Sequence, residues 1–311
     1  MIKRTLYFGN PAYLKTVNEQ LVIEQPLPVS ASQNETTLAV KANSRTIPIE
    51  DIGLLILDHR QITITQALLS KLLSNNTAVV SCDDTHHPTG LLLHLDGHSL
   101  HSQKFRAQLD ASLPLKKQLW QQTVSAKISN QASLLSIHRE ENKILLQLAS
   151  GVKSGDSDNC EAQAANYYWK RIFPDYLEFR RERYGPPPNN LLNYGYSILR
   201  ALVARSLVAS GLLPVMGIHH SNQYNAYCLA DDIMEPYRPF VDRVVCQLVR
   251  SNGQYLEMSP SMKKALLEVP ALDVYMEGRK SPLMNAVQRT TASLAKCFEG
   301  QSRKILYPEL Q

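Results

Sequence analysis

A histidine followed at a short interval by two carboxylates is the feature of this sequence best suited to chemistry. His220 lies in a loop-like segment, and Asp232 and Glu235 follow at the i, i+3 spacing that puts two side chains on one face of a helix. Two carboxylates with an imidazole suit a hard divalent cation, Mg²⁺ or Mn²⁺, better than a closed zinc site. Sites of this kind commonly process phosphodiesters.

A carboxylate further upstream, Glu161, is the best candidate for a further ligand. It falls on the otherwise apolar stripe of a predicted helix, shared with Ala165, Tyr168 and Ile172. Burying a carboxylate without a partner is costly, so we expect Glu161 to meet a cation or a hydrogen-bond donor. The alternative is a capping box with Asp158, in which Glu161 bonds only the backbone. The residues alone leave both possibilities open.

Structural roles also compete for the other candidates. His220 could be an ordinary loop or core histidine, the neighbouring His219 could replace it, and the two downstream carboxylates could form an exposed acidic face. Pro236 disfavours helical geometry at Glu235, so a helix should end or kink there. Asp231 projects roughly 160° away from Glu235 around the helix axis, so we expect it to be solvated or structural.

Basic and aromatic residues interleave after Glu161, a mixture that could hold phosphates and stack bases. The candidates for DNA binding are Tyr168, Lys170, Arg171, Arg180, Arg181 and Arg183. Residues 1–100 carry 7 Lys/Arg and 9 Asp/Glu, whereas residues 101–311 carry 26 and 19, so the positive excess lies with the candidate site. A polyanionic partner would account for this distribution. A helix interface with a solvated face is the alternative.

Five histidines near the end of the first hundred residues form a rival metal site: His86, His87, His94, His98 and His101. They lack cysteine partners and a finger-like spacing, and residues 91–95 form a predicted strand in which i, i+4 residues stand apart. We therefore favour the carboxylate site over zinc at these histidines.

The elements that must position these residues divide the chain into two parts. Short β-rich segments predict strands at residues 13–17, 21–24, 37–41, 52–57 and 77–82, with one helix at 65–73. The hydrophobic period then becomes helical and predicts helices at 114–137, 158–173, 190–210, 229–235, 241–250, 261–268 and 281–298. Ser281-Pro282 is a typical helix start. We predict an α+β protein with a small β-rich N-terminal domain, residues 1–100, and a larger all-α domain, residues 101–311.

The bulk composition excludes several classes of protein. No run approaches 18 consecutive apolar residues, so we expect no membrane span. The N-terminus lacks the apolar run of a signal peptide. The five cysteines are scattered and contain no CxxC, which favours free thiols in a reducing cytoplasm.

Several motifs, taken together and in order, resemble the CRISPR-associated Cas1 integrase family, most closely its type II branch. They are Lys127–Ala132, Glu161–Ala165, Asn193–Ala201, Gly211–Pro214, Gly217–His220 and Leu229–Pro236. The resemblance implies a metal-dependent DNA endonuclease and integrase that inserts new spacers into a CRISPR array. It implies that Glu161, His220 and Glu235 are the catalytic metal ligands. Asp232 then matches an acidic position one turn before the last ligand.

The resemblance also implies partners. The family works as a homodimer, for which we expect the N-terminal domain to supply the contact. Two such dimers flank a dimer of the small protein Cas2 in a heterohexamer that binds double-stranded prespacer and repeat DNA, with other type II adaptation proteins as further partners. Two alternatives remain: a nuclease that cuts branched DNA without joining it, and a DNA-binding scaffold without catalysis.

Overall fold

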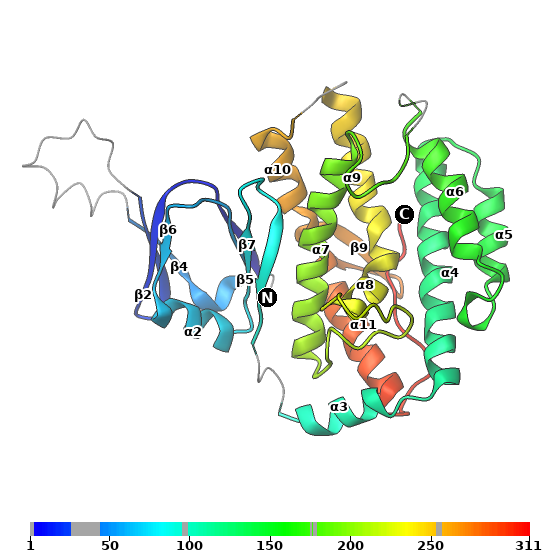
Figure 1. Cartoon of the computed structure of the whole chain (residues 1–311), viewed down its shortest axis with the longest axis horizontal. Helices are drawn as coiled ribbons and strands as arrows, with labels where there is room; N and C mark the ends of the chain where they lie inside the picture. Colours follow the sequence, from blue (N-terminus) through cyan, green and yellow to red (C-terminus); the bar gives the residue numbers. More distant parts are fainter. Residues whose placement is uncertain (1–2, 26–43, 95–98, 175, 177–178, 253–256) are drawn as a thin grey trace, which may run out of the picture. The chain divides into compact units, whose positions relative to one another are not determined.

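The chain folds into two compact units, Met1–Gly97 and His98–Gln311, and each is described by itself (Figure 1). The computed structural model describes residues 3–25, 44–94, 99–174, 176, 179–252 and 257–311. The predicted strand at 37–41 and His98 lie outside these residues. No helix among the described residues has both the length and the apolar character needed to cross a bilayer.

Two four-stranded sheets make up the N-terminal unit. The first has the order β1 (Arg4–Phe8), β5 (Ile52–Leu57), β7 (Ala78–Cys82), β8 (Pro88–Leu92), with β8 antiparallel to β7 and the other pairs parallel. The second has the order β4 (Arg45–Pro48), β3 (Gln20–Glu24), β2 (Ala12–Val17), β6 (Ile62–Ile64). The 3₁₀ turn η1 (Ile49–Asp51) leads into β5, and helix α2 (Gln66–Ser74) begins after its N-cap, Thr65.

The hydrophobic pattern explains the core of this unit. The sequence Ile-Gly-Leu-Leu-Ile-Leu of β5 is a continuous apolar run, as expected for a strand covered on both faces. Its Ile52 and Leu55 are fully buried with Leu14 of β2 and Leu68 of α2. Strand β1 was not predicted, because it begins with the polar Arg4 and Thr5 and contains only three consecutive apolar or aromatic residues.

Helices build the larger unit, as predicted, although those at His101–Leu109 and Lys143–Gly151 were not predicted. Their bounds are α3 (His101–Leu109), α4 (Leu113–Ile137), α5 (Lys143–Gly151), α6 (Cys160–Ile172), α7 (Asn189–Ala209), α8 (Cys228–Met234), α9 (Arg238–Asn252), α10 (Pro260–Leu267) and α11 (Leu283–Phe298). The described part of this unit also contains three 3₁₀ turns: η2 (Ser154–Asp156), η3 (Glu235–Tyr237) and η4 (Val269–Ala271).

The helical unit also contains a short hairpin that the all-α prediction lacked. Strand β9 (Asp273–Met276) pairs antiparallel with β10 (Arg279–Pro282). The connecting Glu277 and Gly278 have φ of 52° and 71°, and positive φ at both central residues is what a type I′ hairpin turn requires. The predicted helix start at Ser281-Pro282 is therefore wrong, because these residues belong to β10 and the helix begins at Leu283.

Helix α4 is the element on which the site is assembled. Ser112 caps it by accepting a hydrogen bond from the Leu115 amide, and Pro114 lies in its first turn. It packs against α5, α6, α9 and η3, so it is covered along much of its circumference (Figure 1). Buried Leu119, Ile128 and other residues on several of its faces reflect this position.

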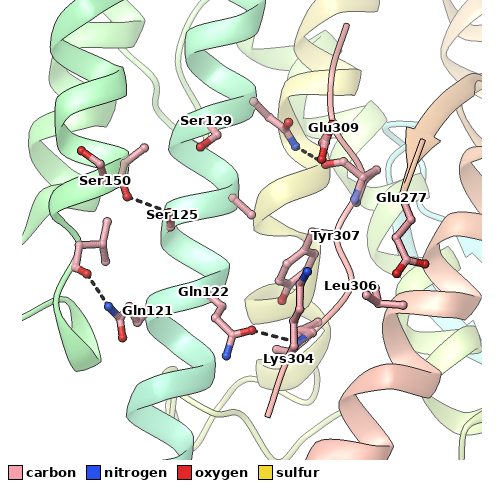
Figure 2. Close-up of a pocket in the computed structure, with 16 residues that line it drawn as sticks. Gln121, Gln122, Ser125, Ser129, Ser150, Glu277, Lys304, Leu306, Tyr307 and Glu309 are labelled. Carbon is pink, nitrogen blue, oxygen red and sulfur yellow. Dashed lines mark hydrogen bonds between the residues drawn. The ribbon is translucent and has the colours of Figure 1, made fainter. Parts of the chain in front are cut away.

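The chain's C-terminal segment, residues 303–310, lies along α4 and is held by two side-chain amides. Gln122 donates to the Arg303 carbonyl (2.8 Å) and accepts from the Ile305 amide (2.9 Å). Figure 2 shows Gln122, Lys304 and Tyr307 beside the open groove that separates this segment from the Ser125 side of α4.

Asn130, two turns further along α4, repeats the same arrangement. It donates to the Pro308 carbonyl (3.0 Å) and accepts from the Leu310 amide (3.0 Å). The same Nδ2 also donates to the carbonyl of Pro236 (2.8 Å), the residue after Glu235. We refer to the contacts of Gln122 and Asn130 with the segment as the amide clasp. It ties the C-terminal segment to α4 and to η3.

Candidate functional site

Three elements bring Glu161 and Glu235 to one lysine. Glu161 lies in the first turn of α6, Glu235 begins η3, and Lys127 projects from the middle of α4. The Lys127 ammonium lies 2.7 Å from Glu161 Oε1 and 2.6 Å from Glu235 Oε2. The carboxylates predicted to share a metal therefore converge on a single cation.

Glu235 is held from its other side by Arg238, whose Nε lies 2.7 Å from Oε1. Burial by itself would raise the pKa of Glu235, but Arg238 and Lys127 outweigh it and lower the pKa to about 2. Glu235 is thus a buried, ionised carboxylate at neutral pH.

A second fixed cluster forms around Asp232, which is fully buried. It accepts hydrogen bonds from the amides of Ile218 (2.7 Å), His219 (3.0 Å) and His220 (3.3 Å), and its Oδ1 lies 2.5 Å from His220 Nδ1. Both oxygens of Asp232 are therefore engaged by the loop, and Asp232 positions His220. Since Nδ1 is used in this way, His220 would coordinate a metal through Nε2.

The charge environment of His220 follows from this arrangement. The hydrogen bond that His220 donates to Asp232 raises the pKa of His220, burial lowers it in part, and the charges of Glu235 and Glu161 raise it further. His220 therefore lies within electrostatic reach of both carboxylates.

Neighbouring residues fix the loop that carries His220. The ring of His219 stacks on Trp120 of α4, with centroids 4.2 Å apart and parallel planes, so its position is set by packing. Trp120 also meets His220 edge-on at 5.6 Å. A Cβ at Gly217 would lie 2.2 Å from the His220 carbonyl oxygen and 2.8 Å from Asp232 Oδ2, so only glycine fits there.

Asp231 has the structural role that its angular position indicated. It pairs with Arg200 Nε at 2.7 Å and accepts a hydrogen bond from Asn225 Nδ2 at 2.7 Å. The kink expected at Pro236 is the 3₁₀ turn η3, which joins α8 to α9.

The capping-box alternative for Glu161 is wrong. Helix α6 begins at Cys160 after a left-handed Asn159, and Asp156 caps it by accepting from the amides of Cys160 (2.8 Å) and Glu161 (3.0 Å). Asp158 instead pairs with Lys153. The Glu161 side chain is consequently released from capping and reaches Lys127.

The donor set fits a divalent cation. Glu235 Oε2 is buried and, although paired with Lys127, accepts no hydrogen bond of good geometry from the described residues. An ammonium between two carboxylates also shows that this position accommodates a cation. As the side chains stand, no three His, Cys, Asp or Glu residues in the described ranges lie close enough to bind one metal, and Lys127 contacts both Glu161 and Glu235. Together, Glu161, Glu235 and His220 Nε2 would supply the oxygen and nitrogen ligands.

The rival histidine site finds no support among the described residues. His86 Nδ1 lies 2.8 Å from Asp58 Oδ1, and His87 Nδ1 lies 3.4 Å from the Thr85 carbonyl oxygen. Within the ranges that the structure describes, these histidines form no metal-binding group.

The candidate DNA-binding residues divide by exposure. Lys170, Arg180 and Arg183 are exposed. Arg171 lies over the Tyr167 ring at 3.6 Å. Arg181 is partly buried and is bonded to the side chains of Asn189 (3.0 Å) and Asn193 (2.7 Å), so it braces the loop before α7.

The prediction that Tyr168 binds DNA is wrong, because its side chain is fully buried and cannot stack on a base. The helix begins later than predicted, and its buried stripe is Cys160, Ala164, Tyr168 and Ile172. The Tyr168 hydroxyl donates to Asp242 at 2.8 Å, and the Tyr196 hydroxyl donates to the same carboxylate at 2.5 Å.

The buried carboxylate of Asp242 makes the free energy of unfolding depend on pH. Burial raises the pKa of Asp242 to about 6, against the two tyrosine hydrogen bonds and the charges of Arg238 and Arg181, which lower it. Because the folded pKa lies above the unfolded one, this group's stabilising contribution is complete below about pH 4 and disappears as pH rises through about 6. Asp242→Asn should remove that decline, of which roughly 1 kcal/mol falls between pH 5 and pH 7.5. Urea unfolding of both proteins at pH 5 and pH 7.5 measures it, and equal pH dependence in the two would contradict the prediction.

Three residues that shape the site had no role predicted from the sequence: Lys127, Arg238 and Trp120. Lys127 did carry a signal, since it lies between Val124 and Ile128 on the buried side of a long helix. A lysine in such a position needs a charged partner. Arg238 and Trp120 gave no comparable signal.

Comparisons with known proteins agree with this fold. Residues 8–258 match the model of the family described as CRISPR associated protein Cas1. The CRISPR-associated endonuclease Cas1 of Neisseria meningitidis is 33% identical over 313 residues, covering 100% of this chain and 97% of the relative. A second such endonuclease, from Pyrobaculum aerophilum, is 28% identical over 82% of this chain and 90% of its own.

Solved structures share the architecture. A casposase bound to an integration product superposes with a TM-score of 0.76 at 19% identity, over 98% of this chain and 92% of its own. A Cas1 protein from Thermotoga maritima superposes with a TM-score of 0.72 at 16% identity, over 96% and 98%. The fold is thus that of the Cas1 and casposase class, a β-rich unit followed by a helical one. The chain belongs to the Cas1 family of CRISPR-associated endonucleases, which confirms the family that the motifs predicted.

Proposed function

We propose that this protein is a divalent-metal-dependent integrase that inserts spacer DNA into the repeat of a CRISPR array, in a type II system. The observation that carries the proposal is the convergence of Glu161 and Glu235, from separate elements, on one cation position near His220. The family supplies the endonuclease class, and the site supplies ligands suited to Mg²⁺ or Mn²⁺.

The proposed reaction is a transesterification. The 3′-hydroxyl of a captured DNA fragment attacks a phosphodiester at the repeat edge, a new P–O bond forms, and the broken P–O bond releases a repeat strand with its own 3′-hydroxyl. A bound Mg²⁺ or Mn²⁺ would offset charge on the phosphate and stabilise the attacking or leaving oxygen.

The chain's own residues would prepare this site. Asp232 fixes the ring of His220 so that Nε2 is presented for coordination. Arg238 holds Oε1 of Glu235, so that Oε2 is directed to the shared cation position. Asp156 caps α6 and thereby leaves the Glu161 side chain for the site.

The partners are proposed from relatives of known structure. Solved neighbours include a Cas6-RT-Cas1–Cas2 complex and a Cas1–DNA complex. We propose that this chain likewise binds double-stranded prespacer and repeat DNA in the cytoplasm. We further propose that it forms homodimers through the N-terminal unit, and that two dimers join a Cas2 dimer in a heterohexamer, with other type II adaptation proteins as partners.

A strand-transfer gel tests the proposal. The full chain with its Cas2 partner, a labelled prespacer and supercoiled repeat DNA should give joined product with Mn²⁺ and none with EDTA. Cleaved but unjoined products would favour a branched-DNA nuclease. DNA binding that is indifferent to metal, without joining or cleavage, would favour a scaffold.

The exposed arginines before α7 should contribute to phosphate binding. Replacing Arg180 and Arg183 together by alanine should weaken DNA binding at 100 mM salt by about tenfold and reduce the slope of log K against log salt by about 2. The exposed Arg60, in the N-terminal unit, provides a matched control whose replacement by alanine should leave both quantities unchanged. Fluorescence anisotropy over a salt series measures them, and an unchanged slope in the double variant would show that these residues do not touch DNA.

A further inference from the structure

The position between the two carboxylates is filled by the protein's own cation. Lys127 Nζ lies within 2.7 Å of an oxygen of each carboxylate, and its side chain is only 12% exposed. Glu161 and Glu235 lie 74 positions apart in the sequence, on α6 and η3. Without a cation between them, two carboxylates close enough to contact the same ammonium would repel each other.

A divalent metal and this ammonium cannot occupy the gap together. Mg²⁺ binds carboxylate oxygens at about 2.0–2.1 Å, which would place it almost on the position of an ammonium that contacts the same two oxygens. Like charges at such a separation repel strongly in a buried site. One of the two cations must therefore leave.

The contacts of the two basic side chains, Arg238 and Lys127, indicate which of them a bound metal would displace. Arg238 bonds Oε1 of Glu235 and lies over the Tyr196 ring at 4.4 Å, so it is fixed by two contacts on the far side of the carboxylate. Lys127 has a flexible four-carbon stem and three donors that are not tied to one geometry. Glu235 Oε2 also accepts no well-formed hydrogen bond from Lys127, so this contact is the weaker restraint.

We propose that Lys127 is a tethered cation that holds Glu161 and Glu235 together in the metal-free protein and is displaced when the metal binds. The inference rests on the proposed metal site and adds to it a competitor built into the chain. Its consequence is that metal affinity is set by an exchange of cations and not by the ligands alone.

Calorimetric titration with Mn²⁺ alone, on the full chain, tests the exchange. Lys127→Met should tighten Mn²⁺ binding, with an apparent Kd lower by on the order of tenfold, because couplings between sites are commonly about 5- to 150-fold. Lys153→Met is a matched control, since Lys153 forms an exposed ion pair with Asp158 just before α6. That variant should bind Mn²⁺ like the parent. Equal or weaker binding by Lys127→Met would overturn the proposal.

A Glu161→Gln variant distinguishes failure of the cation exchange from failure of the proposed metal site. Loss of Mn²⁺ binding in this variant, with Lys127→Met equal to the parent, would leave the metal site standing and overturn only the exchange. Absence of binding in the parent and in Lys127→Met would overturn both. Binding by Lys127→Met alone would support the exchange in its strongest form.

A second measurement needs no variant and covers the case in which Lys127→Met fails to fold. Acetylation of Lys127 in the parent protein, followed by mass spectrometry, should be slow without metal and about tenfold faster with saturating Mn²⁺, since a displaced ammonium loses its two carboxylate partners. Lys153, paired outside the site, should react at the same rate in both conditions. An unchanged rate at Lys127 would contradict the displacement.

Discussion

Glu161→Gln is expected to abolish DNA joining, lowering the strand-transfer rate by about 10³-fold or more, a loss of roughly 4 kcal/mol of transition-state stabilisation. The substitution keeps the shape of the side chain and removes the charge that a metal needs. It also removes one of the two carboxylates that pair with Lys127. Single-turnover joining of a labelled prespacer, at several Mn²⁺ concentrations, measures the rate.

Glu161→Gln has a control in the same part of α6. Asp158→Asn also removes a carboxylate near the helix start, but that carboxylate pairs with Lys153 away from the site. Its joining rate should stay within about twofold of the parent, because an exposed ion pair contributes about 0–1 kcal/mol. Comparable loss in both variants would place the effect in the folding of α6 and not in the chemistry.

Asp232→Asn is expected to lower joining by about 10- to 100-fold, the usual effect of removing a group that orients a metal-bound histidine. It should also reduce the free energy of unfolding by about 3 kcal/mol, because an amide nitrogen replaces an oxygen that accepts backbone hydrogen bonds. Denaturant unfolding and single-turnover joining measure the two effects.

The same substitution should shift the pH dependence of metal binding. The hydrogen bond that His220 donates to Asp232 raises the pKa of His220, and a protonated imidazole cannot bind a metal. Metal affinity in the parent should therefore rise with pH through this raised pKa, and in Asp232→Asn the rise should move to lower pH. Asp231→Asn is the control, since Asp231 pairs with Arg200. A shift in that variant as large as in Asp232→Asn would contradict the assigned roles.

Local patterns singled out the carboxylates as candidate ligands, whereas the choice of His220 over His219 came from the resemblance to the Cas1 family. The spacing of Asp232 and Glu235 indicates one helical face, and Glu161 stands out beside an apolar stripe. That these segments meet on Lys127 could not be predicted from residue types, since it depends on how α4, α6 and η3 pack. The position of Lys127 between Glu161 and Glu235 exists only in the folded chain.

Predictions of helices were more successful than predictions of their ends. The helical spacing of apolar residues over a long segment predicted the start of α4 to within one residue. The start of α6 was placed two residues early, because Asp156 caps the helix from a turn that contains a left-handed Gly155, with φ of 72°. The hairpin β9–β10 was missed since its strands are only four residues long, too short for an alternating pattern to stand out.

The amide clasp has a consequence for which substitutions the chain can tolerate. The hydrogen bonds of Gln122 and Asn130 to residues 303–310 use only main-chain groups, so these hydrogen bonds do not depend directly on the side chains there. Proline is compatible with position 308, which supplies only a carbonyl, and would remove a donor at Ile305 or Leu310. We therefore expect related sequences to vary at the exposed side chains of residues 303–310 and to vary little at Gln122 and Asn130.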